Sequence, residues 1–286
     1  MSSPDLSSDA PYADWVGRTE LAADIIVPSV VQRLWATLDR PDSPPGAGEP
    51  LPLLAHWLYF LPAARQSQLG ADGHELRGRF IPPIDLPRRM WAGSQITCRH
   101  PIEIGAPAER RTTIRKIVKK QGRTGPLVFV TLGHEIFDST GVAIEETQDI
   151  VYREAVPAGA VPIPPEPELD SEFSRQVTAD AVMLFRYSAL TFNGHKIHYD
   201  RDYATEKEGY PGLVVHGPMI AALLVDLLQR SVPGFSPARL DIRAISPLFE
   251  GAEFSLHCAR KGTDQAELWA CNPEGRLAMK ISLSAA

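Results

Sequence analysis

A motif that occurs once in each half of the chain constrains its fold more than any other feature. The spacing I-x4-P-[IL]-x-x-G is found at 96–105 and again at 242–251. Each copy is followed by a [DN]-x-x-G turn, at 138–141 and at 272–275, between runs rich in apolar and β-branched residues. Such a turn between two strand-like runs is typical of a β-hairpin. Two matches in the same order predict a duplicated structural unit.

A proline-rich stretch separates the two copies. Residues 155–170 contain five prolines and almost no periodic pattern, which predicts a semi-extended linker. The first half is then 12–154 and the second half 171–286. The first eleven residues are rich in Ser, Asp and Pro, so we expect 1–11 to be a disordered tail.

Each half is expected to contain four consecutive antiparallel strands. The predicted strands are 94–103, 111–120, 126–137 and 143–153 in the first half, and 239–248, 252–261, 264–271 and 276–284 in the second. The predicted helices are 24–38, 179–190 and 217–230. The last of these is apolar nearly all round and should be buried. A buried helix followed by antiparallel strands predicts an α+β fold in which a sheet wraps the helix.

The first half lacks an equivalent of this buried helix. Three prolines between 79 and 91 are incompatible with a long regular helix there. We therefore expect the central helix of the first copy to be degenerate. The space that it leaves beside the first sheet could hold the tail of a bulky substrate.

Composition narrows the class of function. The 286 residues carry a formal net charge of −6, whereas a nucleic-acid-binding protein normally shows a basic face. No apolar run approaches the length of a membrane span, and no secretory signal opens the chain. We expect a cytoplasmic protein with neither nucleic-acid nor membrane partners.

The segment 191–200, TFNGHKIHYD, concentrates polar side chains that suit proton transfer. Histidine titrates near neutrality and can both accept and donate a proton, so His198 is the first candidate for a catalytic residue. Asn193 is the second: its amide would position a water molecule, and the alternative is that it only forms the turn before a glycine.

The same segment could be mistaken for a metal site, because His195, His198 and Asp200 form H-x-x-H-x-D. The zinc motif H-E-x-x-H on a helix is absent, so no metal is expected. A structural role is expected for His195 and Asp200, with Asp200 holding the loop or capping the segment that follows it.

Two further groups complete the set of candidates. Gly217 opens the apolar helix, where a backbone N–H could face a developing negative charge, and a simple helix-cap role is compatible with that. His216 precedes it and is a candidate for binding the substrate. Arg88 and Arg89 could pair with a carboxylate or phosphate, although adjacent charges usually form a solvated face.

The segment 187–204 resembles the MaoC-like (hydratase 2) signature, in which the loop reads approximately S-G-D-x-N-P-[LI]-H-x-D. The resemblance implies that His198 stands at the catalytic histidine of that family and Asn193 at its catalytic aspartate. An amide cannot be a general base. Either His198 is the principal acid–base group while Asn193 orients the water, or a carboxylate from elsewhere supplies the missing function.

The first half carries a narrower resemblance. Residues 56–62, 69–74, 82–93 and 125–131 are similar to the subgroup that contains itaconyl-CoA and mesaconyl-C4-CoA hydratases. The family fold is a double hotdog, in which two antiparallel sheets each wrap a helix, here with the N-terminal helix degenerate. The subgroup also implies no redox or metal cofactor, since coenzyme A is part of the substrate.

The activity implied is that of a hydro-lyase that adds water to mesaconyl-C4-CoA or itaconyl-CoA to give citramalyl-CoA, as in itaconate degradation. The expected partner is a small CoA thioester, and the expected assembly is a homodimer, with a monomer as the alternative. Three other functions stay open: a 3-hydroxyacyl-thioester dehydratase of fatty-acid metabolism, an acyl-CoA thioesterase, and a non-catalytic acyl-CoA binding module. The last gains weight from the change of aspartate to asparagine.

Overall fold

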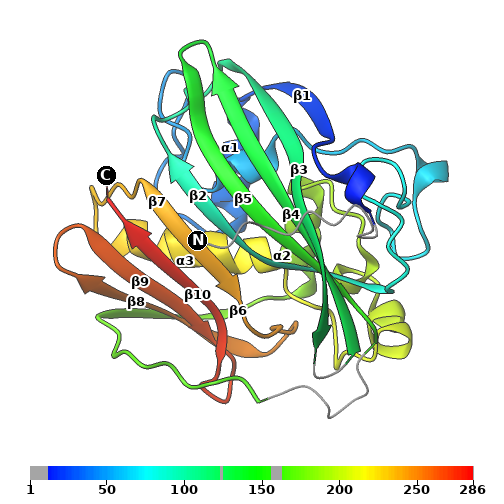
Figure 1. Cartoon of the computed structure of the whole chain (residues 1–286). Helices are drawn as coiled ribbons and strands as arrows, with labels where there is room; N and C mark the ends of the chain where they lie inside the picture. The colour runs from blue at the N-terminus through cyan, green and yellow to red at the C-terminus, as the bar shows by residue number, and fades with distance from the viewer. Residues whose placement is uncertain (1–11, 123–124, 156–162, 286) are drawn as a thin grey trace, which may run out of the picture.

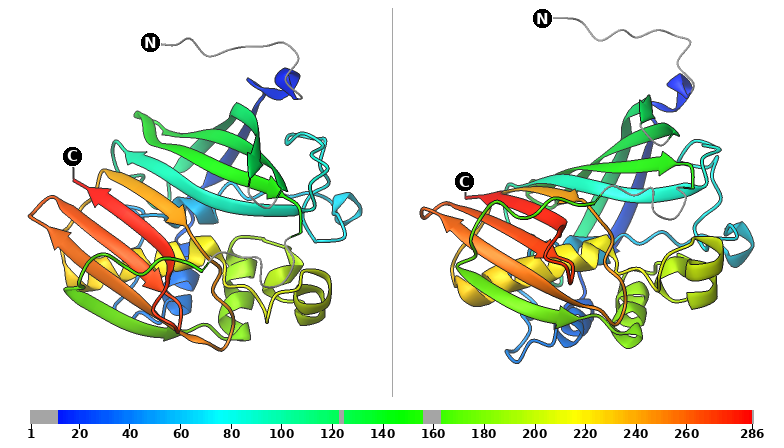
Figure 2. Two further views of the ribbon diagram at one scale, coloured as in Figure 1. Left: turned by 60° about the horizontal axis from the view of Figure 1, so that its bottom comes forward. Right: turned by 90° about the horizontal axis from the view of Figure 1, so that it is seen from below.

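The computed structural model describes residues 12–122, 125–155 and 163–285. Ten antiparallel strands form one sheet, and the helices lie on one side of it (Figure 1 and Figure 2). The strands are β1 (Thr19–Ile25), β2 (Arg88–Cys98), β3 (Pro107–Gly122), β4 (Gly125–Asp138), β5 (Gly141–Arg153), β6 (Phe173–Thr178), β7 (Arg239–Ala244), β8 (Glu253–Lys261), β9 (Gln265–Cys271) and β10 (Leu277–Ser284). The α-helices are α1 (Pro28–Thr37), α2 (Ala181–Leu190) and α3 (Gly217–Ser231).

The two halves have the same topology. The sheet order is β1-β3-β4-β5-β2-β7-β10-β9-β8-β6, so each half contributes five strands in the same sequence of neighbours. The halves join edge to edge where β2 pairs with β7. The repeated motif makes Gln95 equivalent to Asp241, and these two residues face each other in that pairing. The duplication predicted from the motif is therefore present in the strand order and in the junction.

All eight predicted strands are present, although their ends differ. The structure starts β2 at Arg88 and ends it at Cys98, several residues before the predicted limits. It also adds β1 and β6, which are the two edges of the sheet and carry mostly exposed or half-buried side chains. An edge strand with few buried residues has a weak apolar pattern, which is why the sequence did not predict them. The helix predicted from residue 24 begins at Pro28, because β1 runs to Ile25.

The second half is built around α3, in which every side chain from Met219 to Leu228 except that of Ala222 is buried. The helix packs against β6, β8, β9 and β10. The first half has only the 3-10 helix η2 (Ala55–Leu58) in the corresponding place, followed by a long loop that reaches β2. Ile84 and Leu86 of that loop are buried against β4 and β5 in a separate apolar cluster. The expected loss of the central helix in the first copy is thus confirmed.

The two copies of the I-x4-P-[IL]-x-x-G motif have similar conformations. Ile102 and Leu248 of the two motifs are both buried, and Gly105 and Gly251 both have positive φ, at 99° and 76°.

The predicted tail at 1–11 lies outside the described residues, as does 156–162 of the linker. The described part of the linker contains no helix or strand, and the Pro165 carbonyl accepts a hydrogen bond from the Leu277 N–H at 2.9 Å. No helix in the described residues has both the length and the apolar character needed to cross a membrane.

Candidate active site

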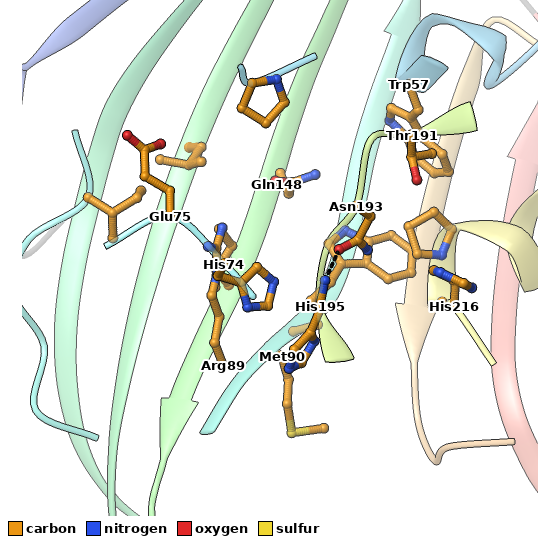
Figure 3. A pocket seen from close by; sticks show the side chains of 18 of the residues that line it. Trp57, His74, Glu75, Arg89, Met90, Gln148, Thr191, Asn193, His195 and His216 are labelled. Carbon is orange, nitrogen blue, oxygen red and sulfur yellow. Dashed lines mark hydrogen bonds between the residues drawn. The ribbon is translucent and has the colours of Figure 1, made fainter. Parts of the chain in front are cut away.

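One cavity of about 1120 Å³ collects all the candidate residues, and both halves of the chain line it. Its wall on the first half is the inner face of β3, β4 and β5, the region that the degenerate helix leaves open. Figure 3 shows the labelled side chains of the two halves facing each other across this space. The sequence candidates that line the cavity are His198, Asn193, Gly217, Arg88, Arg89 and His216.

The loop after α2, residues 191–200, is held by short hydrogen bonds. The Asn193 N–H donates to the Ser188 carbonyl at 2.8 Å, which turns the chain back against the end of α2. The Asn193 Oδ1 accepts the His195 N–H at 3.0 Å, a bond typical of an Asx turn. Asp200 Oδ1 accepts the Tyr203 N–H at 3.0 Å, so the predicted capping role of Asp200 is confirmed. We call residues 191–200 the catalytic loop below, after the role that the sequence predicts for His198.

His198 ends the 3-10 helix η4 (Lys196–His198) and is buried. Its Nδ1 donates to the Val214 carbonyl at 2.7 Å, which leaves Nε2 as the proton-accepting nitrogen. Burial lowers the pKa of His198 to about 4, although the hydrogen bond to Val214 opposes that shift. The ring is therefore neutral near pH 7 and able to act as a base.

His216 stacks on the His198 ring, with 3.7 Å between ring centroids and 17° between planes. Its Nε2 lies 2.9 Å from the Ser188 Oγ, and burial keeps its pKa well below the ordinary histidine value. A neutral, fixed ring of this kind supports the orientation of His198.

Gly217 is the first residue of α3, whose opening N–H groups have no partner within the helix. A side chain at this position would place Cβ 2.7 Å from Cε3 of Trp91, so the Trp91 ring packs directly on the glycine. Gly217 lines the cavity at the positive end of a buried helix, where a developing oxyanion would be stabilised.

The two arginines differ in their partners. Arg88 forms a salt bridge with the Glu208 carboxylate, donates to the Glu208 carbonyl, and lies over the Tyr210 ring. Arg89 forms no salt bridge within the described residues, and its side chain points toward His74 and His195 (Figure 3). Of the two, Arg89 is the one available to a ligand.

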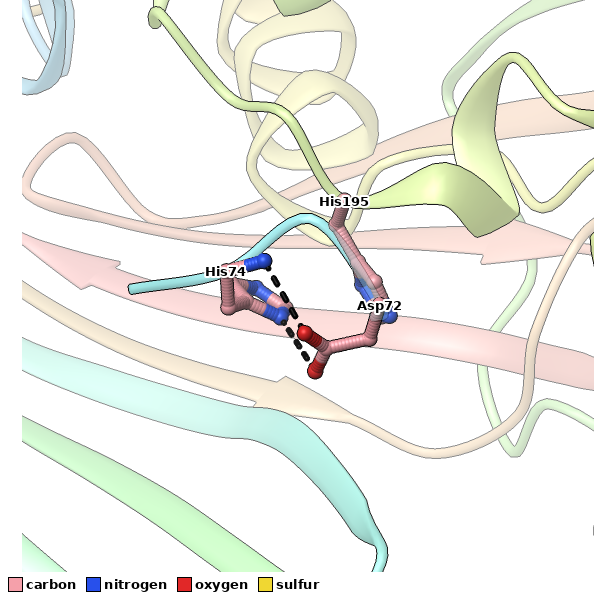
Figure 4. Close-up of side chains that lie close together, drawn as sticks. All are labelled: Asp72, His74 and His195. Carbon is pink, nitrogen blue, oxygen red and sulfur yellow. Dashed lines mark hydrogen bonds and ion pairs between the residues drawn. The ribbon is translucent and has the colours of Figure 1, made fainter. Parts of the chain in front are cut away.

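The structure adds a group that the sequence did not single out. Asp72 and His74 lie on the loop before β2, and Asp72 Oδ2 accepts from His74 Nδ1 at 3.2 Å (Figure 4). The His74 ring centroid is 4.1 Å from that of His195, which is 5.5 Å from that of His198. The D-G-H sequence was visible within the resemblance at 69–74, but nothing in it indicated that this loop reaches the catalytic loop.

A second buried polar group anchors η2 to the sheet. Glu146 of β5 accepts hydrogen bonds from His56 at 3.2 Å, from Trp57 at 3.0 Å and from Ser94 at 2.6 Å. Burial alone would raise the pKa of Glu146, but the hydrogen bond and charge of His56 outweigh it and lower that pKa to about 2. With its lone pairs engaged in this way, Glu146 holds the segment that replaces the missing helix.

The described residues include one group whose donor atoms are spaced as metal ligands could be. Asp72, His74 and His195 bring three such atoms within 4.8 Å of one another. The Asp72 carboxylate already accepts from His74, so a metal ion would have to displace that hydrogen bond. The sequence expectation of no metal cofactor stays a prediction.

Known proteins are similar to this chain over most of its length. A family model for hydroxyacyl-thioester dehydratase type 2 matches residues 54–250. The mesaconyl-C(4)-CoA hydratase of Chloroflexus aurantiacus is 49% identical over 283 residues, which cover 96% of this chain and 98% of that protein. The match therefore includes both halves, the junction between them and every candidate residue.

Solved structures agree on the fold. HtdX of Mycobacterium tuberculosis superimposes with a TM-score of 0.66 at 18% identity, covering 94% of this chain and all of the other. A second Mycobacterium tuberculosis protein, which has a double hotdog fold, matches with a TM-score of 0.58 at 12% identity over 94% of this chain and 96% of its own. The predicted α+β double hotdog is thereby confirmed.

Proposed function

The chain belongs to the hydroxyacyl-thioester dehydratase type 2 family, and from that premise we propose that it is a hydro-lyase acting on a short dicarboxylic enoyl-CoA. The proposed reaction adds water to mesaconyl-C4-CoA to give citramalyl-CoA. The near full-length similarity to a mesaconyl-C(4)-CoA hydratase supports this substrate. Itaconyl-CoA carries an isomer of the same acyl group, so hydration of either thioester would serve itaconate degradation.

The observation that carries the proposal is the pairing of a free His198 Nε2 with the start of α3 in one cavity. The thioester carbonyl makes Cβ of the enoyl group electrophilic. His198 would take a proton from the water that attacks Cβ, and the Gly217 N–H would stabilise the enolate oxygen that forms. No redox or metal chemistry is part of this route.

Arg89 supports the dicarboxylic substrate. In mesaconyl-C4-CoA the free carboxylate is attached to Cβ, so it must lie beside the reacting carbon. A buried carboxylate without a partner is costly, and a guanidinium is the group that pairs with it best. Arg89 lies next to the catalytic loop, whereas the charge of Arg88 is already satisfied by Glu208.

Replacing Arg89 by Ala tests this assignment, with Arg88→Ala as the neighbouring comparison. Loss of one charged hydrogen-bonded pair is worth about 1.5–3 kcal/mol, so kcat/KM for mesaconyl-C4-CoA should fall roughly tenfold to over a hundredfold. Crotonyl-CoA, which has no second carboxylate, should lose far less. Equal losses on both substrates would instead indicate a contact with the CoA phosphates.

The family description supports one alternative, a dehydratase of 3-hydroxyacyl thioesters. Longer acyl chains could be accommodated, since the cavity extends along the inner face of the first half of the sheet. A panel of enoyl-CoA esters, followed by loss of the conjugated thioester absorbance and by mass spectrometry of the products, separates the two. A wild-type preference for crotonyl-CoA or longer chains would favour the alternative. Release of free CoA would identify a thioesterase, and binding without turnover a non-catalytic module.

We also propose that the chain forms a homodimer. Sedimentation velocity of the purified protein tests that assembly, and a single species with the mass of one chain would contradict it.

A further inference from the structure

Asn193 leaves the proposed reaction one proton-transfer group short, because an amide neither accepts nor releases a proton near neutral pH. Its Oδ1 is also engaged by the His195 N–H. Hydration requires one proton to leave the water and one to reach Cα. A second group that exchanges protons should therefore be found near the catalytic loop.

The carboxylates that line the cavity can be compared one by one. They are Glu20, Asp72, Glu75, Glu146 and Glu208. Glu208 is paired with Arg88, Glu146 with His56, and Glu75 with Arg79. Glu20 is exposed on the edge strand β1. Asp72 is the member of the set whose residue bonds to the catalytic loop, through its carbonyl, which accepts the Lys196 N–H at 2.9 Å.

The loop of Asp72 is locked to the catalytic loop by two glycines. A side chain at Gly73, which has φ +89°, would place Cβ 1.8 Å from the Gly194 carbonyl oxygen. A side chain at Gly194 would lie 2.9 Å from the Gly73 carbonyl oxygen. The two backbones therefore touch, and this contact fixes Asp72 and His74 relative to His195 and His198.

His74 is held in the same way as His198. Its Nδ1 donates to Asp72 Oδ2 at 3.2 Å, and its backbone N–H donates to Asp72 Oδ1 at 3.0 Å. One ring nitrogen is thus tied, and Nε2 is left to exchange a proton with a ligand in the cavity that His74 lines. An imidazole oriented by a carboxylate is an arrangement that stabilises an imidazolium during catalysis, and the Asp72 carboxylate is partly buried here.

We propose that Asp72 and His74 form the second acid–base centre of this active site, with His74 as the catalytic residue and Asp72 as the residue that positions it. The inference rests on the proposed hydration reaction. The water oxygen bonds to Cβ while one of its protons moves to His198 Nε2, and the double-bond electrons pass to the enolate. The enolate then takes a proton at Cα from Nε2 of the His74 imidazolium. The proton on His198 returns to His74 through solvent, and dehydration runs the same steps in reverse.

Charged groups of both signs surround His74. Asp72 lies on the same loop, as does Arg77; Arg89 comes from β2 and His195 from the catalytic loop. Burial has the largest effect and lowers the pKa of His74, and the two arginines lower it further. The hydrogen bond and charge of Asp72 raise that pKa and offset part of the decrease. Burial opposes ionisation of Asp72, but the hydrogen bond and charge of His74 outweigh it and hold the pKa of Asp72 below its usual value. The carboxylate is thus ionised at neutral pH, and the dyad can hold one proton.

The first test compares His74→Ala with His100→Ala. His100 also pairs with an aspartate, Asp138, at 3.0 Å, but this pair lies outside the cavity. His74→Ala should lower kcat for mesaconyl-C4-CoA by about 10²–10⁴-fold with little change in KM. Added imidazole should raise the kcat of His74→Ala at least fivefold, and this rescue should saturate with imidazole concentration. His100→Ala should keep wild-type kcat and show no rescue.

The second test compares Asp72→Asn with Asp138→Asn. Hydration needs His74 protonated, so kcat/KM falls as the pH rises through the pKa of His74. Removing the Asp72 charge lowers that pKa, and the alkaline limb of the profile should move to lower pH by about one unit. The rate should fall roughly tenfold, and Asp138→Asn should leave the profile unchanged. This variant also tests the dyad if His74→Ala does not fold.

Three results would overturn the inference. One is a folded His74→Ala enzyme that keeps more than a tenth of wild-type kcat. Another is an Asp72→Asn profile that coincides with that of the wild type. The third is a wild-type activity that EDTA abolishes and Zn²⁺ restores, because the three groups would then hold a metal. A wild-type protein that hydrates no enoyl-CoA would defeat the proposed function itself, and the dyad with it, whereas an active wild type with an active His74→Ala enzyme defeats the dyad alone.

Discussion

At the scale of single residues, the histidines of the cavity are distinguished by what holds their rings. His198 is tied to a backbone carbonyl, His74 to a carboxylate and His216 to a serine hydroxyl. His198 and His74 are bonded through Nδ1, which leaves Nε2 free to act on a ligand, whereas the Nε2 of His216 is already engaged by Ser188. The three side chains are chemically identical, and they differ in which ring nitrogen remains available to a ligand.

Replacing His198 by Gln should remove the base while the fold persists. We expect kcat to fall by about 10²–10⁴-fold, the range for a positioned proton transfer. His257→Gln is the control, since His257 stacks on Trp269 and does not line the cavity. Steady-state kinetics and circular dichroism of both variants provide the measurement. A folded His198→Gln enzyme with more than a tenth of wild-type kcat would show that another group is the base.

Asn193 can be tested with two substitutions. In Asn193→Asp a carboxylate oxygen can still accept the His195 N–H, so the turn should persist. The added charge should raise the pKa of the neighbouring histidines and the KM for a dicarboxylic substrate. Asn193→Ala should cost about 0.5–1.5 kcal/mol of stability through the lost hydrogen bond. Identical kinetics and pH profiles for Asn193→Asp and wild type would make Asn193 a turn residue alone.

The sequence singled out cavity residues of the second half, together with Arg88 and Arg89 of the first half, but it did not single out Asp72 and His74. His198, Asn193 and Gly217 belong to a compact part of the second half, where the order of residues reflects their proximity. Asp72 and His74 reach them only because a loop of the first half docks there. No local pattern encodes such a contact between halves, so it could not be predicted without the fold.

At the scale of elements, the loop that carries His74 replaces a helix, and its position depends on glycine. Gly73 and Gly78 both have φ +89°, so alanine strains the backbone equally at either site. A Cβ at Gly73 would clash with the Gly194 carbonyl, whereas at Gly78 the nearest atom is the Pro83 Cβ at 3.7 Å. The pair therefore separates backbone strain from loop docking.

We expect Gly73→Ala to lower kcat at least tenfold more than Gly78→Ala, because only the first displaces His74 from the catalytic loop. The positive φ should cost both variants a similar amount of stability, and Gly73→Ala should lose more because its Cβ also clashes with the Gly194 carbonyl. Thermal unfolding and kinetics measured side by side are sufficient. Equal activities would show that the contact between the loops has no part in catalysis.

Elements were predicted best where their pattern was strong. The strands β4 and β5 and the apolar helix α3 have strong apolar patterns, and their predicted limits agree with the structure within two residues. The edges β1 and β6 were missed because a strand with one neighbour buries few side chains. The proline-rich segment before β2 correctly predicted the loss of a helix, since proline excludes that structure for local reasons.

At the scale of the whole molecule, buried histidines make stability depend on pH. Burial lowers the pKa of His198 and of His134 to about 4 and that of His195 to about 2, and it keeps the pKa of His216 well below its usual value. In the unfolded chain these rings titrate near pH 6.5. Below that pH the unfolded chain binds protons that the folded protein excludes, so acid favours unfolding.

The free energy of unfolding should therefore fall between about pH 6.5 and pH 4. Each fully depressed histidine contributes about 1.4 kcal/mol per pH unit in that window. Urea unfolding at pH 7.5 and pH 5.5 measures the difference, and proton uptake on unfolding at pH 5.5 confirms its origin. The same midpoint at both pH values would mean that the rings are protonated in the folded state.

The edge-to-edge junction of β2 and β7 has a consequence for how the enzyme behaves on dilution. The strands that form the first-half wall of the cavity and the loop that carries His198 come from different halves of the chain, yet the two halves are covalently joined. Had they been separate subunits, each site would exist only above some concentration of partners. Here each cavity wall from the first half comes with one loop from the second half at any dilution. A substitution in one half also leaves the sequence of the other half unchanged. One half was thereby free to lose a helix while the other kept it.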